Sequence, residues 1–143
     1  MFNTGDRILS IDYGEKRIGI AVTDPLRLFA QPLVTLPNDK NLWQNLSEIL
    51  KEYKVTLILL GYPLKENGEK SSVADKVESF CEGLKKRTKI EILYRDERYS
   101  SGIATQRIIE TVKSKKKRRD KSLIDKTAAA VILEDYLNET CSG

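Results

Sequence analysis

Two apolar stretches separated by a short polar turn, at residues 8–14 and 18–24, most constrain what this chain can fold into. In both stretches the side chains alternate in the manner of a β-strand, with large aliphatic residues between small or polar ones. The polar residues 15–17 predict the turn that joins them as a hairpin. The chain therefore opens with an antiparallel pair of strands, and the first of them ends in a carboxylate, Asp12.

Strand and helix patterns alternate along the rest of the chain. Apolar runs bounded by turn residues predict strands at 33–36, 55–60 and 90–97. Helical spacing predicts four helices. The first begins within 38–41 and reaches residue 53, and the second begins after a capping Ser71 or Ser72 and ends at Gly83 and the polar residues 85–89. The third covers 102–112 and the fourth 122–138. Strands that alternate with helices after an opening meander predict an α/β fold. Its mixed five-stranded sheet is antiparallel at the opening, parallel where helices cross over, and flanked by helices.

The composition is that of a globular protein with one domain, residues 1–143. Hydrophobic residues make up 40% and charged residues 32% of the sequence, and no apolar run approaches the roughly 20 residues that span a bilayer. The N-terminus lacks the features of a secretory signal, and the two cysteines suggest neither a disulfide framework nor a metal-ligand spacing. We therefore expect a cytoplasmic protein.

The sequence contains no histidine. This excludes Ser/His/Asp triads, Cys/His dyads, imidazole bases and histidine-ligated zinc. Any catalysis must use carboxylates, lysines, hydroxyls or a hard metal ion held by oxygen ligands.

Three acidic residues occupy positions where such chemistry is expected. Asp12 shares a face of its strand with Ile8 and Ser10, Glu97 ends the strand over 90–97, and Asp125 lies in the first turn of the last helix. Ligands of open α/β sheets collect at the carboxyl ends of parallel strands. Three carboxylates that converge there would repel one another unless a divalent cation held them. The trio therefore predicts a metal site.

Each acid also has a structural alternative. Asp12 alone is compatible with a turn or capping residue. Asp125 stands three residues after Ser122, which is capping-box spacing, and Glu97 could pair with a neighbouring arginine or with Lys16.

Basic and hydroxyl side chains near these acids are candidates for binding a nucleic-acid backbone. Lys16 and Arg17 follow the Asp12 strand, and Arg98, Ser100 and Ser101 stand at an expected helix start. Residues 113–121 contain seven basic residues and one acid, among them Lys115, Lys116, Lys117, Arg118 and Arg119. Such a run binds phosphates by releasing counterions. The alternatives are a solvent-facing hairpin residue for Arg17 and a solvated loop for the basic run.

Four motifs resemble, in order, those of YqgF/RuvX-type proteins. They are DYGEKRIGIAVTD at residues 12–24, LGYPL at 60–64, DERYSS at 96–101 and IDKTAAAVIL at 124–133. The resemblance covers almost the whole chain, although Tyr62 and Ser101 differ from the residues usual in the family.

The resemblance implies an RNase H-like fold and metal-dependent phosphodiester cleavage, with the acidic roles on Asp12, Glu97 and Asp125. It implies a role in processing the 5′ end of precursor 16S rRNA, with cleavage of four-way Holliday junction DNA as the older proposal. In the mechanism that this chemistry favours, Asp12 bridges one or two Mg²⁺ or Mn²⁺ ions, and Glu97 and Asp125 complete the coordination of the ions.

Two other classes of protein remain open alternatives. The opening hairpin also resembles that of sugar kinases and actin-like ATPases, but these proteins need a second half for which 143 residues leave no room. The other alternative is a non-catalytic RNA-binding factor in ribosome assembly. The sequence does not decide between a monomer and a homodimer.

Overall fold

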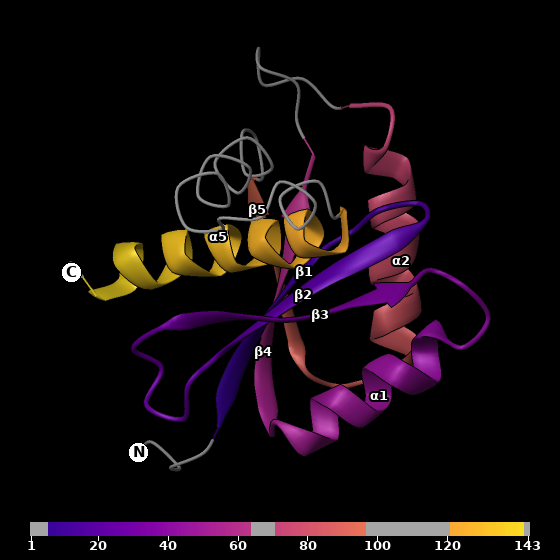
Figure 1. Ribbon diagram of the computed structural model, residues 1–143. Helices are drawn as coiled ribbons and strands as arrows, with labels where there is room; N and C mark the ends of the chain where they lie inside the picture. The colour runs from indigo at the N-terminus through magenta and orange to yellow at the C-terminus, as the bar shows by residue number, and fades with distance from the viewer. Residues whose placement is uncertain (1–5, 64–70, 97–120, 142–143) are drawn as a thin grey trace.

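The computed structural model describes residues 6–63, 71–96 and 121–141 (Figure 1). Its centre is a five-stranded sheet in the order β3-β2-β1-β4-β5. The strands are β1 (Arg7–Asp12), β2 (Arg17–Thr23), β3 (Ala30–Pro37), β4 (Val55–Tyr62) and β5 (Glu91–Asp96). β1, β2 and β3 form an antiparallel meander, whereas β4 lies parallel to β1 and β5 parallel to β4. The predicted mixed sheet is confirmed.

The helices cover both faces of the sheet. α1 (Leu42–Glu52) and α2 (Ala74–Arg87) pack on one face, and α5 (Lys121–Cys141) crosses the other (Figure 1). Each face has its own apolar core, because side chains alternate along the strands. Leu9 and Ile11 of β1 belong to the core under α1 and α2, whereas Ile8 packs with α5. The alternation places Asp12 on the α5 face.

The turn between β1 and β2 covers residues 13–16 and not 15–17 as predicted, and Arg17 is the first residue of β2 rather than part of the turn. A Cβ atom on Gly14 would stand 2.4 Å from the carbonyl oxygen of Arg17, so the turn can close this tightly only around a glycine. Asn38 secures the turn, since its side-chain Nδ2 donates to the carbonyl oxygen of Gly14 at 2.9 Å.

Other element boundaries also differ from the prediction. β3 covers eight residues where a strand over 33–36 was predicted, and it includes Pro32 and Pro37, as an edge strand allows. Neither Ser71 nor Ser72 is the N-cap of α2; Val73 is, and the Ser71 hydroxyl accepts a hydrogen bond from the Val73 N–H just before the helix begins. Gly83 lies inside α2, which runs on to Arg87, because the apolar face of the helix keeps packing on the sheet.

The predicted loop at 64–70, the predicted helix at 102–112 and the basic run up to residue 120 lie outside the described residues. No helix of the described ranges is long and apolar enough to cross a membrane.

Candidate active site

Asp12 is the last residue of β1, the central strand of the sheet, and its side chain is half-buried. Its partner across the antiparallel pair is Gly19 of β2. Facing residues of such a pair have their Cα atoms only about 4.5–5.5 Å apart. Whatever packs on Gly19 is therefore a direct neighbour of Asp12.

The first turns of α5 pack on Gly19. A Cβ atom on this glycine would stand 2.0 Å from the carbonyl oxygen of Asp125 and 2.9 Å from the backbone nitrogen of Lys126. The helix can approach the strand this closely only because the side chain is missing. Gly19 thus places the backbone of Asp125 on the same face of the sheet as Asp12 and next to it.

Asp125 forms an ion pair with Arg17. The Nε of Arg17 donates to Oδ2 of Asp125 at 2.9 Å, and the two side chains are 37% and 25% exposed. Arg17 stands two residues before Gly19 on β2, so both face α5. The site therefore contains two carboxylates and one guanidinium, all within reach of solvent.

This arrangement differs from two of the alternatives considered for these residues. Arg17 is not a purely solvent-facing turn residue, because it belongs to β2 and binds Asp125. For Asp125, α5 already begins at Lys121, so Ser122 lies inside the helix and not at its cap. The Asp125 carboxylate points to the sheet, where it accepts a hydrogen bond from Arg17 of β2.

Glu97, the third acid, directly follows the last residue of β5 and lies outside the described residues. So do Arg98, Ser100, Ser101, Lys115, Lys116, Lys117, Arg118 and Arg119. Lys16 is exposed in the turn between β1 and β2. Within the described ranges there is no cluster of three or more carboxylate or thiol side chains that could hold a metal ion. The described residues thus supply two of the three expected ligands.

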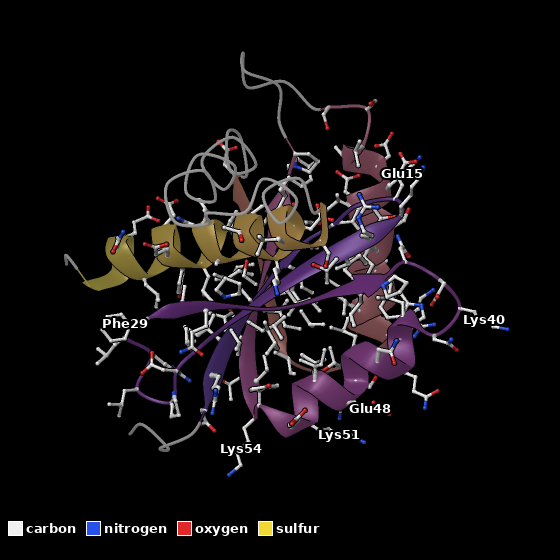
Figure 2. All side chains as sticks on the ribbon, viewed as in Figure 1. Glu15, Phe29, Lys40, Glu48, Lys51 and Lys54 are labelled. Carbon is white, nitrogen blue, oxygen red and sulfur yellow. The ribbon has the colours of Figure 1, made fainter. Side chains whose placement is uncertain are left out.

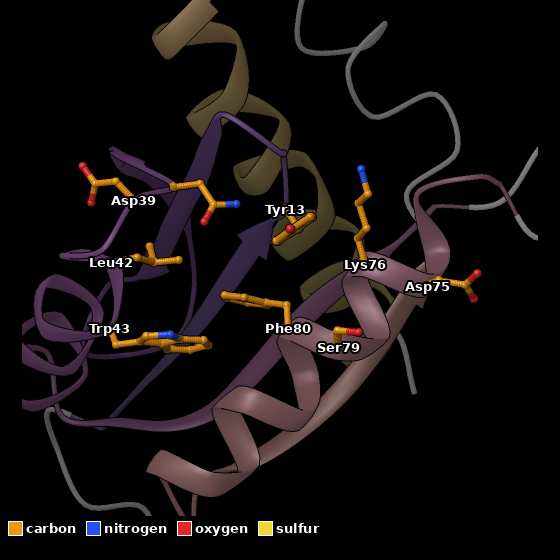
Figure 3. Close-up of a pocket in the computed structure, with 9 residues that line it drawn as sticks. Tyr13, Asp39, Leu42, Trp43, Asp75, Lys76, Ser79 and Phe80 are labelled. Atoms are coloured by element: carbon orange, nitrogen blue, oxygen red, sulfur yellow. The ribbon is translucent and has the colours of Figure 1, made fainter.

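A hollow of about 400 Å³ lies on the other face of the sheet, between α1 and α2 (Figure 3). Phe80 stacks on Trp43 with ring centroids 5.2 Å apart, and Tyr13 leans against Phe80 at the same distance. Tyr13 follows Asp12 in the chain, but the alternation of the strand turns the two side chains to opposite faces. The acids Asp39 and Asp75 line this hollow and Asp12 and Asp125 do not, so we do not assign it to the site.

Tyr62, which differs from the usual family residue, also packs on the α2 side. Its hydroxyl donates to Oε1 of Glu78 at 2.6 Å, and its ring meets Tyr94 edge-on at 4.9 Å. Burial and the neighbouring Cys81 raise the pKa of Tyr94, so its hydroxyl stays neutral. The Tyr62 difference therefore changes the α2 face and leaves the face of Asp12 untouched.

The sequence analysis missed the role of Gly19 and the pairing of Arg17 with Asp125. A signal for the first was present, since Gly19, Ala21 and Thr23 form a face of small residues on β2. The last helix carries three consecutive alanines, Ala128, Ala129 and Ala130, all buried. Small residues on both elements predict a close approach, but only the fold shows that β2 and α5 meet.

The family model that matches this chain is RuvX, described as Holliday junction resolvase, and it covers residues 6–139. A protein of Sulfurihydrogenibium sp. named "Putative pre-16S rRNA nuclease" is 38% identical over 134 residues, which are 92% of this chain and 90% of that protein. A protein of the same name from Salinibacter ruber is 40% identical over 136 residues, or 94% of each chain.

Solved structures share the fold at lower identity. T. thermophilus RuvC in complex with a Holliday junction substrate superposes with a TM-score of 0.59 at 12% identity, over 94% of this chain and 96% of that one. The Fowlpox virus resolvase in complex with its Holliday junction DNA gives 0.57 at 17% identity, over 94% and 98%. These structures confirm the expected RNase H-like fold. With sequence relatives that match it along nearly its whole length, the chain belongs to the RuvX family of nucleases.

Proposed function

We propose that this protein is a metal-dependent phosphodiester nuclease that processes the 5′ end of precursor 16S rRNA in the cytoplasm. The observation that carries the chemistry is the placement of Asp12 and Asp125 on one face of the sheet, which the contact between Gly19 and α5 produces. The substrate is proposed from the printed name of the relatives that match over most of the chain.

The donor set suits a hard divalent cation. Asp12 and Asp125 offer carboxylate oxygens, which Mg²⁺ and Mn²⁺ prefer, and the guanidinium of Arg17 already occupies the position of a cation at Asp125. Glu97 is proposed as the third ligand, because it directly follows β5. The C-terminal end of this strand lies at the same edge of the sheet as the end of β1.

When bound, Mg²⁺ or Mn²⁺ would make a water more acidic for attack on phosphorus and stabilise the leaving oxygen. Asp12 and Asp125 would hold the ion against the sheet. Lys16 and Arg17, which follow β1 at the same end of the sheet, would bind the phosphate that reacts. No histidine is needed as a base, in agreement with its absence from the sequence.

Two other functions are kept as alternatives. Cleavage of four-way DNA is favoured by the description of the family model as Holliday junction resolvase. A non-catalytic RNA-binding role in ribosome assembly would use the same basic residues without the acids.

One experiment tests all three functions. A labelled 5′ fragment of precursor 16S rRNA and a labelled four-way DNA junction are each incubated with Mg²⁺ or Mn²⁺ and with the wild type, Asp12→Asn or Glu48→Gln. Glu48 is exposed on α1, away from the site, so Glu48→Gln is the control for loss of one negative charge (Figure 2).

We expect cleavage of the RNA by the wild type and by Glu48→Gln, and a loss of at least about a hundredfold in Asp12→Asn. Cleavage of the junction alone would establish the resolvase instead. RNA binding without any cleavage that depends on Asp12 would establish the non-catalytic factor.

A further inference from the structure

Arg17 is the basic side chain that the structure brings to the acidic site. It binds Asp125 through one nitrogen, Nε, at 2.9 Å, and more than a third of its side chain remains exposed. A guanidinium has five N–H donors in a planar fork. Arg17 is therefore attached to the site and at the same time accessible to a ligand.

The two partners of this ion pair differ in how firmly they are held. The backbone of Asp125 is fixed against β2, because no room is left above Gly19 for the helix to move closer. Arg17 reaches Asp125 through a long side chain with several rotatable bonds. If the pair opens, it is the guanidinium that moves.

A metal ion and the Arg17 guanidinium require the same carboxylate. A divalent cation bound by Asp125 takes its oxygens at about 2.0–2.2 Å. A guanidinium at hydrogen-bonding distance from one of those oxygens would then lie within a few ångströms of the ion and be repelled by it. In the absence of metal, the same guanidinium offsets the repulsion between Asp125 and its neighbour Asp12.

We propose that Arg17 is an exchangeable counter-ion: it neutralises Asp125 in the metal-free protein and moves to a phosphate of the nucleic acid when a divalent ion takes that carboxylate. This inference rests on the proposed function, since it requires a metal bound by Asp125. Metal binding and phosphate binding then depend on each other, because the metal ion releases the Arg17 guanidinium and the phosphate binds it. Arginine is suited to both roles, since its fork matches carboxylate and phosphate alike.

The exchange is tested first by calorimetric titration with MnCl₂ in the absence of nucleic acid. Arg17→Gln removes the competitor, and we expect Mn²⁺ to bind about two- to fivefold more tightly than to the wild type, the range that a partly exposed ion pair accounts for. Lys51→Gln is the matched control, because it removes one positive charge from the exposed surface of α1 (Figure 2). It is expected to leave the Mn²⁺ affinity within about 1.5-fold, since exposed charges at long range are screened.

A second measurement follows Arg17 in the wild-type protein. The Nε–Hε signal of Arg17 is assigned by its absence from the spectrum of Arg17→Gln, and MgCl₂ is then added. We expect the signal to shift, with a midpoint that matches Mg²⁺ binding. A signal that stays unchanged while Mg²⁺ binds would show a permanent structural ion pair and overturn the inference.

The phosphate half of the exchange has its own readout. Binding of a nuclease-resistant 2′-O-methyl RNA is measured with and without MgCl₂, and Mg²⁺ should tighten binding more for the wild type than for Arg17→Gln. Equal Mn²⁺ affinity in both proteins refutes the exchange alone. If neither the wild type nor Arg17→Gln bound Mn²⁺ or Mg²⁺, the metal-dependent nuclease itself would be refuted.

Discussion

At the scale of single residues, the position that decides the site carries no functional group. Gly19 is buried, lies opposite Asp12 and lets α5 set the backbone of Asp125 against the sheet. The atoms that a Cβ would meet are backbone atoms at 2.0 and 2.3 Å, which cannot turn aside as a side chain can. The absence of a methyl group thus allows the backbone of Asp125 to lie next to Asp12 on one face of the sheet.

We predict that Gly19→Ala lowers the free energy of unfolding by about 3 kcal/mol or more, because the helix must shift to admit the new Cβ. The matched control is Gly83→Ala inside α2. There the new Cβ would stand 2.8 Å from side-chain atoms of Trp43 and not from backbone atoms, and alanine favours the helix by about 1 kcal/mol. Urea denaturation of both variants measures the difference, and a Gly19→Ala protein as stable as Gly83→Ala would contradict the close approach.

At the scale of the elements, most of the architecture could be predicted because it follows from local patterns. Alternation locates β1 and β2, a continuous apolar run locates β4, and helical spacing locates α1 and α2. The faces of Asp12 and Asp125 follow from the same periodicities. Predicting these features does not require knowing which elements contact one another in the fold.

The features that could not be predicted depend on contacts between distant segments. Arg17 and Asp125 are 108 residues apart, and any of several acids was an equally plausible partner in the sequence. β3 continues through its two prolines because β2 offers hydrogen-bonding partners along its whole length. Local sequence preference therefore identifies neither the partner of Arg17 nor the strand that pairs with β3.

The β2–β3 loop is held by the side chains of Asp24 and Arg27. The carboxylate of Asp24 accepts the backbone N–H groups of Leu26, Leu28 and Phe29 at 2.6–3.1 Å. The apolar side chains of these three residues are each more than half exposed, and Phe29 lies directly before β3 (Figure 2). Arg27 adds hydrogen bonds from its Nε to the carbonyl oxygen of Asp6 at 3.2 Å and from its Nη2 to Oγ1 of Thr56 at 2.9 Å. The loop therefore keeps its shape through hydrogen bonds and not through apolar burial.

We predict that Asp24→Asn destabilises the protein by about 1 kcal/mol at pH 7, with the effect kept small by partial exposure to water. Burial raises the pKa of the Asp24 carboxyl, but the N–H groups of Phe29, Leu28 and Leu26 outweigh it and hold the pKa below its ordinary value of 3.8. A lowered pKa in the folded state stabilises the protein above the unfolded value. This contribution is lost as the pH falls below about 3.8 through the folded value.

Urea denaturation at pH 7 and at pH 3 tests this dependence. The difference between the wild type and Asp24→Asn should shrink at the lower pH, where the Asp24 carboxyl of the unfolded wild type is already largely protonated. A difference that is the same at both pH values would show that the charge of Asp24 does not hold the loop. Glu48→Gln again serves as the control for loss of an exposed carboxylate.

At the scale of the whole molecule, charge is distributed unevenly. The chain carries a net charge of +4, and residues 113–121 alone contribute seven basic residues against one acid. The rest of the chain is therefore slightly acidic. A chain of this kind is expected to bind a polyanion through one segment and not over its whole surface.

We predict that five substitutions to glutamine within this segment weaken RNA binding and lower the salt dependence of the binding constant. The substituted residues are Lys115, Lys116, Lys117, Arg118 and Arg119. Each phosphate contact that is lost on a single strand reduces the slope of log K against log salt concentration by about 0.7, so the loss is at most about 3.5.

The control is a fivefold substitution of exposed lysines outside the segment, at Lys40, Lys51, Lys54, Lys86 and Lys89. It removes the same net charge, so an equal fall in slope would mean that RNA responds to the charge of the whole molecule. A fall confined to the first variant would mean that the basic segment makes the contacts, and Asp12→Asn should then keep the wild-type slope while it loses cleavage.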